Sequence, residues 1–156
     1  MSKPTAHEGT PPREPDLASA VRGLALAARS LERAAGDLTL AQYRVLAFVA
    51  AGHERASLVA EGLALAKPTV TATVDWLVER KMVIREAVAG DRRSVRLAVT
   101  RVGAAALRAA EKSMGERLAQ LLEHARDPQA LLTALCDLDD ALADRTRLRL
   151  ERAVRT

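Results

Sequence analysis

The stretch from Ser57 to Thr100 constrains the fold of this chain more than any other. It holds two apolar helical segments, followed by two short segments that flank a charged tip. Pro68 suits the first position of the second helix, with Lys67 as its N-cap. The apolar residues that follow share one helical face: Val70, Val74, Leu77 and Val78. This stretch predicts a helix–turn–helix followed by a β-hairpin, an arrangement that holds duplex DNA.

The exposed side of the second helix, residues 68–80, is small and rich in hydroxyl groups in its N-terminal half. Thr69, Thr71 and Thr73 are therefore expected to contact base edges and thymine methyl groups in the major groove. Lys67 is a poor N-cap, and its ammonium group opposes the positive end of the helix dipole. A phosphate at this helix start would favour both the free N–H groups and the ammonium group, which makes Lys67 a candidate phosphate contact. A solvated lysine is the alternative.

Strands are expected at residues 83–88 and 94–99. In the second strand apolar residues alternate with polar or small ones, which is typical of a half-buried strand. Between the strands, turn residues precede Arg92 and Arg93, whose charge suits the minor groove or its phosphates. The wing is therefore predicted at residues 89–94. An ordinary charged hairpin tip is the alternative, and the neighbouring helix–turn–helix favours the DNA interpretation.

This run resembles the winged helix–turn–helix of the MarR family of bacterial transcription regulators. The family's wing pattern is D-x-R and an alternating strand ending in L/V-T-x-x-G, and it matches Asp91, Arg93, Leu97, Val99, Thr100 and Gly103. The recognition-helix pattern, x-T-V-T after a small or polar residue, matches the segment Lys67–Thr71. These specific motifs lie within residues 57–103, whereas the resemblance in layout covers residues 17–150.

Three positions depart from the family pattern. Ala72 and Trp76 stand where the family often has arginines, and Lys81 replaces the usual glycine after the recognition helix. With fewer basic residues on this helix, its base preferences are expected to differ from those of its relatives. For Trp76 three roles stay open: stacking, packing against the neighbouring helix, or marking a surface that no longer contacts DNA.

Composition and charge agree with a small helix-rich DNA-binding protein. Hydrophobic residues make up 49% of the 156 residues but aromatic residues only 2%, so the core must consist of Leu, Val and Ala. The net charge is +4, and the segment 55–101 holds nine basic residues against five acidic ones. The whole surplus therefore lies in the proposed DNA-binding segment. No apolar run approaches the ~18 residues of a membrane span, and the N-terminus has no apolar signal segment, so a cytoplasmic location is expected.

The chain divides into three kinds of segment. Residues 1–16 hold four of the six prolines and are expected to form a disordered tail. Residues 38–101 form the winged helix–turn–helix, and residues 17–37 and 102–150 form a helical dimerisation region. The outer helices cannot all bury their apolar stripes on so small a body, so a homodimer is expected. The resemblance implies the same, because MarR-like proteins are dimers with an intertwined terminal helix bundle.

The fold class is thus predicted as mainly α with a small β-hairpin wing. The function is predicted as that of a sequence-specific transcriptional regulator, with repression the favoured mode. It would act as a homodimer on a pseudo-palindromic operator, with helix 68–80 in the major groove and the wing at the minor groove. The alternative is a winged-helix protein-interaction module that has lost DNA binding. The resemblance also implies a small-molecule effector of unknown class, in a pocket among the first, second and fifth helices; a regulator without an effector is the alternative.

Catalysis finds no support in the sequence. His7, His53 and His124 have no metal-ligand spacing, and no nucleophile, phosphate-loop or zinc-protease motif occurs. Neither an enzyme nor a cofactor is therefore expected. Cys136 borders the apolar stripe of the last helix and is expected to be a small core residue, because free cysteine is often buried.

Overall fold

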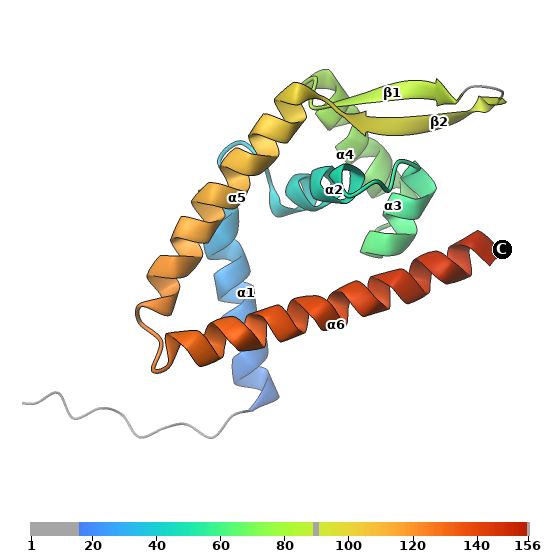
Figure 1. Cartoon of the computed structure of the whole chain (residues 1–156). Helices are drawn as coiled ribbons and strands as arrows, with labels where there is room; N and C mark the ends of the chain where they lie inside the picture. Colours follow the sequence, from blue (N-terminus) through green and yellow to red (C-terminus); the bar gives the residue numbers. More distant parts are fainter. Residues whose placement is uncertain (1–15, 89–90, 156) are drawn as a thin grey trace, which may run out of the picture.

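The computed structural model describes residues 16–88 and 91–155, which form helices and one β-hairpin (Figure 1). The elements are α1 (Leu17–Ala34), α2 (Leu40–Ala50), α3 (Ala56–Leu63), α4 (Lys67–Glu79), β1 (Val83–Val88), β2 (Asp91–Val99), α5 (Arg101–Leu122) and α6 (Pro128–Arg155). The predicted fold class is confirmed. Apart from its last residue, the predicted disordered tail lies outside the described residues. Within the described ranges, no helix has the length and apolar character needed to cross a membrane.

The core lies where α2, α3 and α4 meet the base of the hairpin and the start of α5. Leu46 of α2, Leu77 of α4 and Leu97 of β2 are almost completely buried. Burying such a side chain contributes about 1.5–3 kcal/mol. Because one apolar face of α4 is held in this core, its opposite face is left at the surface.

The start of α2 is specified by the local T-x-x-Q sequence at Thr39–Gln42. The Thr39 hydroxyl accepts a hydrogen bond from the Gln42 N–H at 3.2 Å, and the Gln42 side chain accepts one from the Thr39 N–H at 2.9 Å. This reciprocal capping box satisfies two N–H groups that the helix leaves open. Leu38 is buried and Tyr43 is partly buried against the same core, in keeping with a hydrophobic staple.

The turn between α3 and α4 is made without glycine. Ala64 ends α3 in the left-handed conformation, with φ at 52°. The predicted N-cap of α4 was wrong by one residue: Ala66 is the N-cap, Lys67 is the first helical residue and Pro68 is the second. Proline has no N–H to lose anywhere in the first helical turn, so Pro68 does not distinguish these two starts. Ala66 makes no side-chain capping bond, so this helix start remains uncapped.

The C-terminus of α4 is closed by two backbone hydrogen bonds. The Lys81 N–H donates to Val78 O and the Met82 N–H donates to Leu77 O, both at 2.9 Å. This closure requires a left-handed residue, and Lys81 has φ at 58°. Lys81 therefore occupies a conformation for which glycine is the favoured residue.

The hairpin is antiparallel, and its register runs from Val83 opposite Val99 to Ala87 opposite Val95. The register then shifts, so that Val88 pairs with Asp91 and residues 92–94 fall between paired positions. The strand begins at Asp91, so the prediction that it begins at Ser94 was wrong. A strand can continue through an irregularity that adds residues on one side, and the alternation of side chains does not reveal this. Residues 89 and 90 of the predicted wing lie outside the described residues.

Thr100 joins α4, the base of the hairpin and α5. Its hydroxyl accepts a hydrogen bond from the Gly103 N–H at 3.1 Å and donates one to Lys81 O at 2.6 Å. Its own N–H donates to Met82 O at 3.0 Å. A side-chain carbon at Gly103 would lie only 2.0 Å from Met82 O, so α5 can start here only with glycine at this position.

The outer helices extend away from the winged-helix body. Helix α5 runs beside α1, where the Arg117 Nε donates to the Ser30 hydroxyl at 2.7 Å. Pro128 opens α6, and Asp127 caps it by accepting from the Ala130 N–H at 2.9 Å. Helix α6 then runs back beneath the molecule to α3, so the C-terminal end of the chain lies beside the helix–turn–helix (Figure 1).

Substitution of Gly103 by Ala is expected to destabilise the fold by about 2–3 kcal/mol, because the new methyl group meets the Met82 carbonyl group. Gly115 lies on the same helix with open space around it, so Gly115→Ala is the matched control and should stabilise by up to ~1 kcal/mol. Urea denaturation measures both free energies of unfolding. Equal effects of the two substitutions would contradict the close packing at Thr100.

Substitution of Lys81 by Gly is expected to raise the free energy of unfolding by about 0.5–1 kcal/mol, since relief of the left-handed strain exceeds the entropic cost of glycine. Lys81→Ala removes the same charge but keeps the strain, and no gain is expected from it. Thermal unfolding of both variants separates the two effects. A gain for Lys81→Ala as large as that for Lys81→Gly would show that charge, not backbone conformation, limits stability here.

Candidate nucleic-acid interface

The N-terminal half of α4 offers an exposed surface of small side chains. Val70 and Val74 face the core and are buried. Pro68, Thr69 and Ala72 are exposed on other sides of the helix. Beyond Lys67 at the helix start, the exposed surface of the first two turns is therefore free of bulky groups, which suits an approach to the floor of a groove.

Two of the predicted threonines have their hydroxyl groups engaged by the helix itself. Thr71 Oγ1 donates to Lys67 O at 3.0 Å, and Thr73 Oγ1 donates to Thr69 O at 2.8 Å. Such bonds to the carbonyl four residues earlier are common for threonine within helices. Thr71 is exposed, whereas Thr73 is half-buried. Thr69 and Thr71 therefore lie together with Lys67 on the exposed N-terminal turns, and Thr73 is less accessible.

Trp76 packs against the protein rather than projecting from it. Its side chain is half-buried against the core, and the Arg80 guanidinium carbon lies 4.8 Å from the ring centroid. A cation over the face of an indole ring is attracted by the ring's quadrupole. Among the three roles left open by the sequence, the structure supports packing.

Ion pairs hold the hairpin at a fixed angle to α4. Arg85 of β1 pairs with Asp75 of α4 at 2.5 Å. Arg96 of β2 pairs with Glu86 at 2.7 Å and with Glu54, which precedes α3, at 3.7 Å. Exposed pairs of this kind contribute only about 0–1 kcal/mol each to stability. Their effect here is geometric, because they join the hairpin to two separate parts of the helical body.

These ion pairs also change the distribution of available charge. Arg85 and Arg96 belong to the basic surplus predicted to attract DNA, yet both are paired within the protein. Lys67 is exposed at the start of α4. The side chains of Arg92 and Arg93, predicted to contact DNA from the wing, lie outside the described residues. The described part of the interface thus centres on α4.

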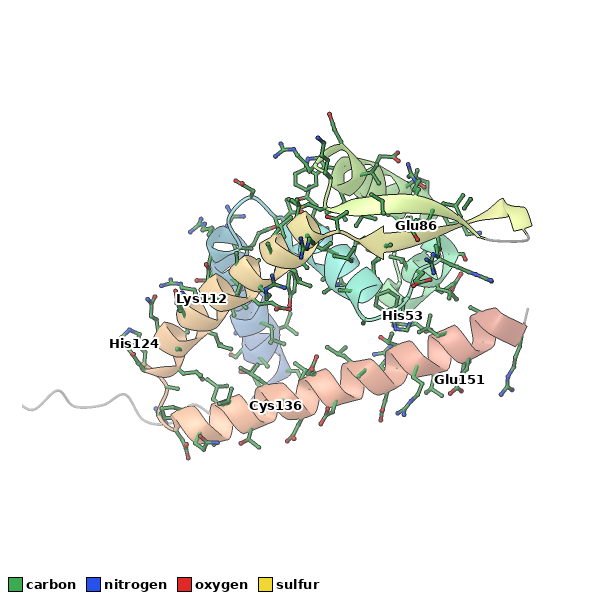
Figure 2. The ribbon with its side chains drawn as sticks, turned by 45° about the horizontal axis from the view of Figure 1, so that its top comes forward. His53, Glu86, Lys112, His124, Cys136 and Glu151 are labelled. Atoms are coloured by element: carbon green, nitrogen blue, oxygen red, sulfur yellow. The ribbon has the colours of Figure 1, made fainter. Side chains whose placement is uncertain are left out.

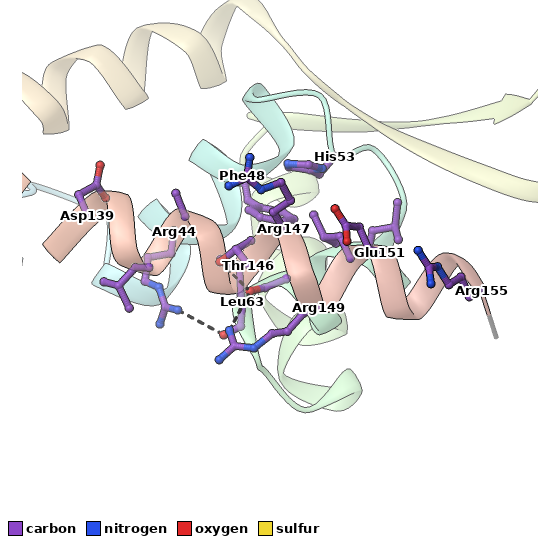
Figure 3. Close-up of a pocket in the computed structure, with 15 residues that line it drawn as sticks. Arg44, Phe48, His53, Leu63, Asp139, Thr146, Arg147, Arg149, Glu151 and Arg155 are labelled. Carbon is purple, nitrogen blue, oxygen red and sulfur yellow. Dashed lines mark hydrogen bonds between the residues drawn. The ribbon is translucent and has the colours of Figure 1, made fainter. Parts of the chain in front are cut away.

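The C-terminus of α3 receives two arginines that sequence reasoning did not connect to it. Arg44 of α2 donates to Leu63 O, and Arg149 of α6 donates to Gly62 O, both at 3.3 Å (Figure 3). Thr146 Oγ1 also donates to Gly62 O, at 3.5 Å. Guanidinium groups satisfy the last carbonyl groups of a helix and favour its negative end. The regular spacing of arginines on the last helix was the signal available in the sequence, but it does not identify the partner.

A cavity of about 1030 Å³ lies between α6 and the α2–α3 pair (Figure 3). Its lining combines apolar side chains, including Phe48, Leu58 and Leu142, with the guanidinium groups of Arg44 and Arg149. This cavity differs from the pocket among the first, second and fifth helices that the sequence led us to expect. It adjoins the helix–turn–helix directly, because Gly62 and Leu63 belong to both.

Titratable groups elsewhere do not form a reaction centre within the described ranges. Burial raises the pKa of Tyr43, and the nearby carboxylates of Glu111 and Asp139 act in the same direction. His53 stacks on Phe48, with the ring centroids 4.1 Å apart. No cluster of three or more metal-ligating side chains is found among the residues that the structure describes.

Cys136 was predicted to be a core residue, and this prediction was wrong. The thiol-bearing residue is exposed on α6 (Figure 2). The apolar stripe that it borders is itself largely unburied in the single chain, so a position beside the stripe does not bury it. Leu131, Leu138 and Leu142 of this stripe are all exposed.

Helix α1 also carries unburied apolar surface. Its apolar stripe consists of Leu17, Val21, Leu24, Ala28, Leu31 and Ala35. The stripe enters the core at its C-terminal end, where Ala35 is buried and Leu31 is partly buried. Toward the N-terminus the same stripe is exposed, with Val21 at 64% and Leu17 at 87% of their maximal accessibility. Half of the stripe is therefore without an apolar partner in the described chain.

A helix–turn–helix whose second helix is exposed and is followed by an antiparallel hairpin is a winged helix–turn–helix. Residues 36–94 of the chain match a family model described as MarR family. This region of the chain is thus similar to the MarR family, as its sequence motifs indicated. No curated protein sequence matches the chain.

Solved structures share this fold over most of the chain. Wild-type MarR from E. coli in its apo form is 22% identical, with 80% of this chain and 97% of that chain covered and a TM-score of 0.67. A MarR mutant from E. coli complexed with operator DNA is 23% identical, with 79% and 97% covered and a TM-score of 0.60. CouR from Rhodococcus jostii, bound to p-coumaroyl-CoA, is 23% identical, with 79% and 87% covered and a TM-score of 0.63. The chain has the fold of MarR-family transcriptional regulators.

Proposed function

We propose that this protein is a sequence-specific DNA-binding transcriptional regulator, with repression as the favoured mode. The observation that carries the proposal is the exposed, unobstructed N-terminal half of α4 beside a hairpin fixed to the same body. The structure of a MarR mutant with operator DNA supports it, because that protein has the same fold. In this proposal α4 enters the major groove and the wing at residues 89–94 approaches the minor groove.

The proposed contacts divide by chemistry. Lys67 and the wing residues Arg92 and Arg93 would contact phosphates, which fix the register on the duplex without reading its sequence. Thr69 and Thr71 would contact base edges, with Thr73 at the margin because it is half-buried. Lys67 suits a phosphate because it stands at an uncapped helix start.

We propose that the protein acts as a homodimer on a pseudo-palindromic operator. Support comes from the exposed apolar stripes on α1 and α6, which a single chain leaves in water. The dimerisation region would be formed by residues 17–37 and 102–150, with residues 38–101 as the DNA-binding region. Two-fold symmetry would then place two α4 helices in successive major grooves.

The alternative is a winged-helix interaction module without DNA binding, suggested by Trp76 and by the arginines missing from α4. Trp76 is half-buried and lies under Arg80, which removes the first reason. The missing arginines remain, and the salt dependence of duplex binding separates the two functions.

Loss of Lys67 is expected to reduce the salt dependence of duplex binding. Each phosphate contact adds about 0.9 to the slope of log K against log salt, so Lys67→Ala should lower the slope by about one per protomer. Arg93→Ala should act in the same way. Lys112→Ala on α5 is the control, since that side chain is exposed and paired with Glu116 away from α4. Fluorescence anisotropy over a salt series measures the slopes, and an unchanged slope for Lys67→Ala would make Lys67 an ordinary solvated lysine.

A charge within the exposed stripe of α1 is expected to disrupt the dimer. Val21→Glu should yield a monomer, because a carboxylate in an apolar interface loses its hydration without gaining a partner. Leu26→Glu is the matched control: Leu26 is exposed on the same helix but lies off the stripe. Light scattering coupled to size exclusion gives the masses. A dimer that survives Val21→Glu would place the interface elsewhere.

We further propose that a small-molecule effector, of a class not fixed by the sequence, binds in the cavity between α6 and the α2–α3 pair. Its apolar walls and arginines suit an organic anion, and CouR is a ligand-bound protein of the same fold. Titration of the duplex complex with p-coumaroyl-CoA, followed by anisotropy, is a first test. Release that Leu58→Arg abolishes, in a variant that still binds duplex, would support the cavity, since the new side chain would occupy it. Release that persists in this variant would place the ligand elsewhere, and no release would reject this ligand.

A further inference from the structure

We infer that α4 recognises thymine through its C5-methyl group, and that Thr71 contributes its own methyl group, not its hydroxyl, to this contact. The inference rests on the proposed DNA-binding function. It goes beyond that function because it names the chemical feature of the duplex that the helix distinguishes.

The Thr71 hydroxyl points toward the backbone of its own helix. Thr71 Oγ1 donates its only proton to Lys67 O at 3.0 Å, within the same helix. The oxygen is thereby turned against the helix backbone, and the methyl group is left as the outward part of an exposed side chain. Thr73 has the same geometry, with its hydroxyl on Thr69 O at 2.8 Å.

Helix α4 lacks most of the side chains that usually distinguish bases in the major groove. Specific contacts to guanine use Arg or Lys on two acceptors, and those to adenine use Asn or Gln. The helix Lys67–Glu79 contains no Arg, Asn or Gln, and its one lysine stands at the first position. Asp75, which could accept from cytosine, is paired with Arg85 at 2.5 Å. Glu79 is the last residue of the helix, far from its first two turns. In those two turns Lys67, at the helix start, is therefore the one side chain of the types that usually distinguish bases by polar contact.

The exposed surface on the first two turns of α4 is largely apolar. After Lys67 at the helix start, the exposed residues of the first two turns are Pro68, Thr69, Thr71 and Ala72, whose outward groups include ring methylenes and methyl groups. The thymine C5-methyl group is the apolar feature that base pairs present in the major groove, and Ala and Thr methyl groups are known partners for it. An apolar reading surface thus selects sequences rich in A·T pairs.

The decisive experiment changes only the methyl groups of the DNA. The wild-type protein is titrated with a duplex of alternating dA and dT, and with the same duplex in which deoxyuridine replaces every thymine. A second pair compares alternating dG and dC with dG and 5-methyl-dC, which places a methyl group at the same position in the groove. We expect binding to weaken about fourfold or more without the thymine methyl groups, and to strengthen with the cytosine methyl groups.

Two variants of Thr71 assign the contact. Thr71→Val keeps a methyl group and removes the hydroxyl, whereas Thr71→Ser keeps the hydroxyl and removes the methyl group. We expect Thr71→Val to keep the preference for thymine over deoxyuridine within about twofold, and Thr71→Ser to lose much of it. The Thr71 methyl group and the thymine methyl group would contact each other, so removing either one removes the same interaction and the two losses in affinity do not add. Circular dichroism confirms that both variants are folded. The variants are needed because methyl groups also change duplex stiffness.

The outcomes separate this inference from the proposed function. If wild-type protein binds the thymine and deoxyuridine duplexes equally, and both with a steep salt dependence, the methyl contact is overturned and DNA binding stands. If Thr71→Ser keeps the preference and Thr71→Val loses it, the hydroxyl is the reading group and the inference is overturned. If no duplex is bound in a salt-dependent way, both the inference and the proposed function fail.

Discussion

The hydrogen bonds of Thr100 fix the relation among α4, the hairpin and α5. Its hydroxyl receives the Gly103 N–H and reaches Lys81 O, so the end of the recognition helix and the start of α5 share one side chain. Gly103 allows the approach, because any side-chain carbon would overlap Met82 O. This arrangement gives physical meaning to the T-x-x-G motif. The motif aims the helix and the wing relative to α5, along which α1 lies.

The hairpin is aimed by charge as well as by backbone contacts. Arg85 pairs with Asp75, and Arg96 pairs with Glu86 and Glu54. These arginines therefore position the wing and add little to the positive charge available to attract DNA. In the proposed complex, a recognition helix with so few charges would depend on shape and apolar contact for its selectivity. Phosphate contacts from Lys67 and the wing would supply affinity, and the face of α4 would supply discrimination.

Much of the fold could be predicted because its signals are local. The capping box of Thr39 and Gln42, the cap of Asp127 on α6 and the alternation along β2 all lie within a few residues of the structure that they specify. The left-handed residues Ala64 and Lys81 could not be predicted as such, because neither is the glycine that usually marks this conformation. Backbone hydrogen bonds at each helix end impose them instead.

The candidate site divides in the same way. The exposed positions of Lys67, Thr69 and Thr71 follow from the period of the apolar face, and the sequence placed them correctly on the surface. The direction of the threonine hydroxyls depends on backbone carbonyls four residues away, and the contact of Arg149 with Gly62 O joins residues 87 positions apart. Such contacts have no local pattern. For the same reason Cys136 was misplaced, because the stripe beside it has no partner in one chain.

In the proposed complex, two α4 helices, each beside its own wing, approach one duplex from a single side. Chemical footprinting on a duplex selected by the protein tests it most directly, with methylation reporting the major groove and hydroxyl radicals the minor groove. We expect two protected major-groove segments on one face of the duplex, separated by about one helical turn or a multiple of it. A protected stretch of minor groove is expected beside each of them. A single protected segment, or protection of the minor groove alone, would contradict it.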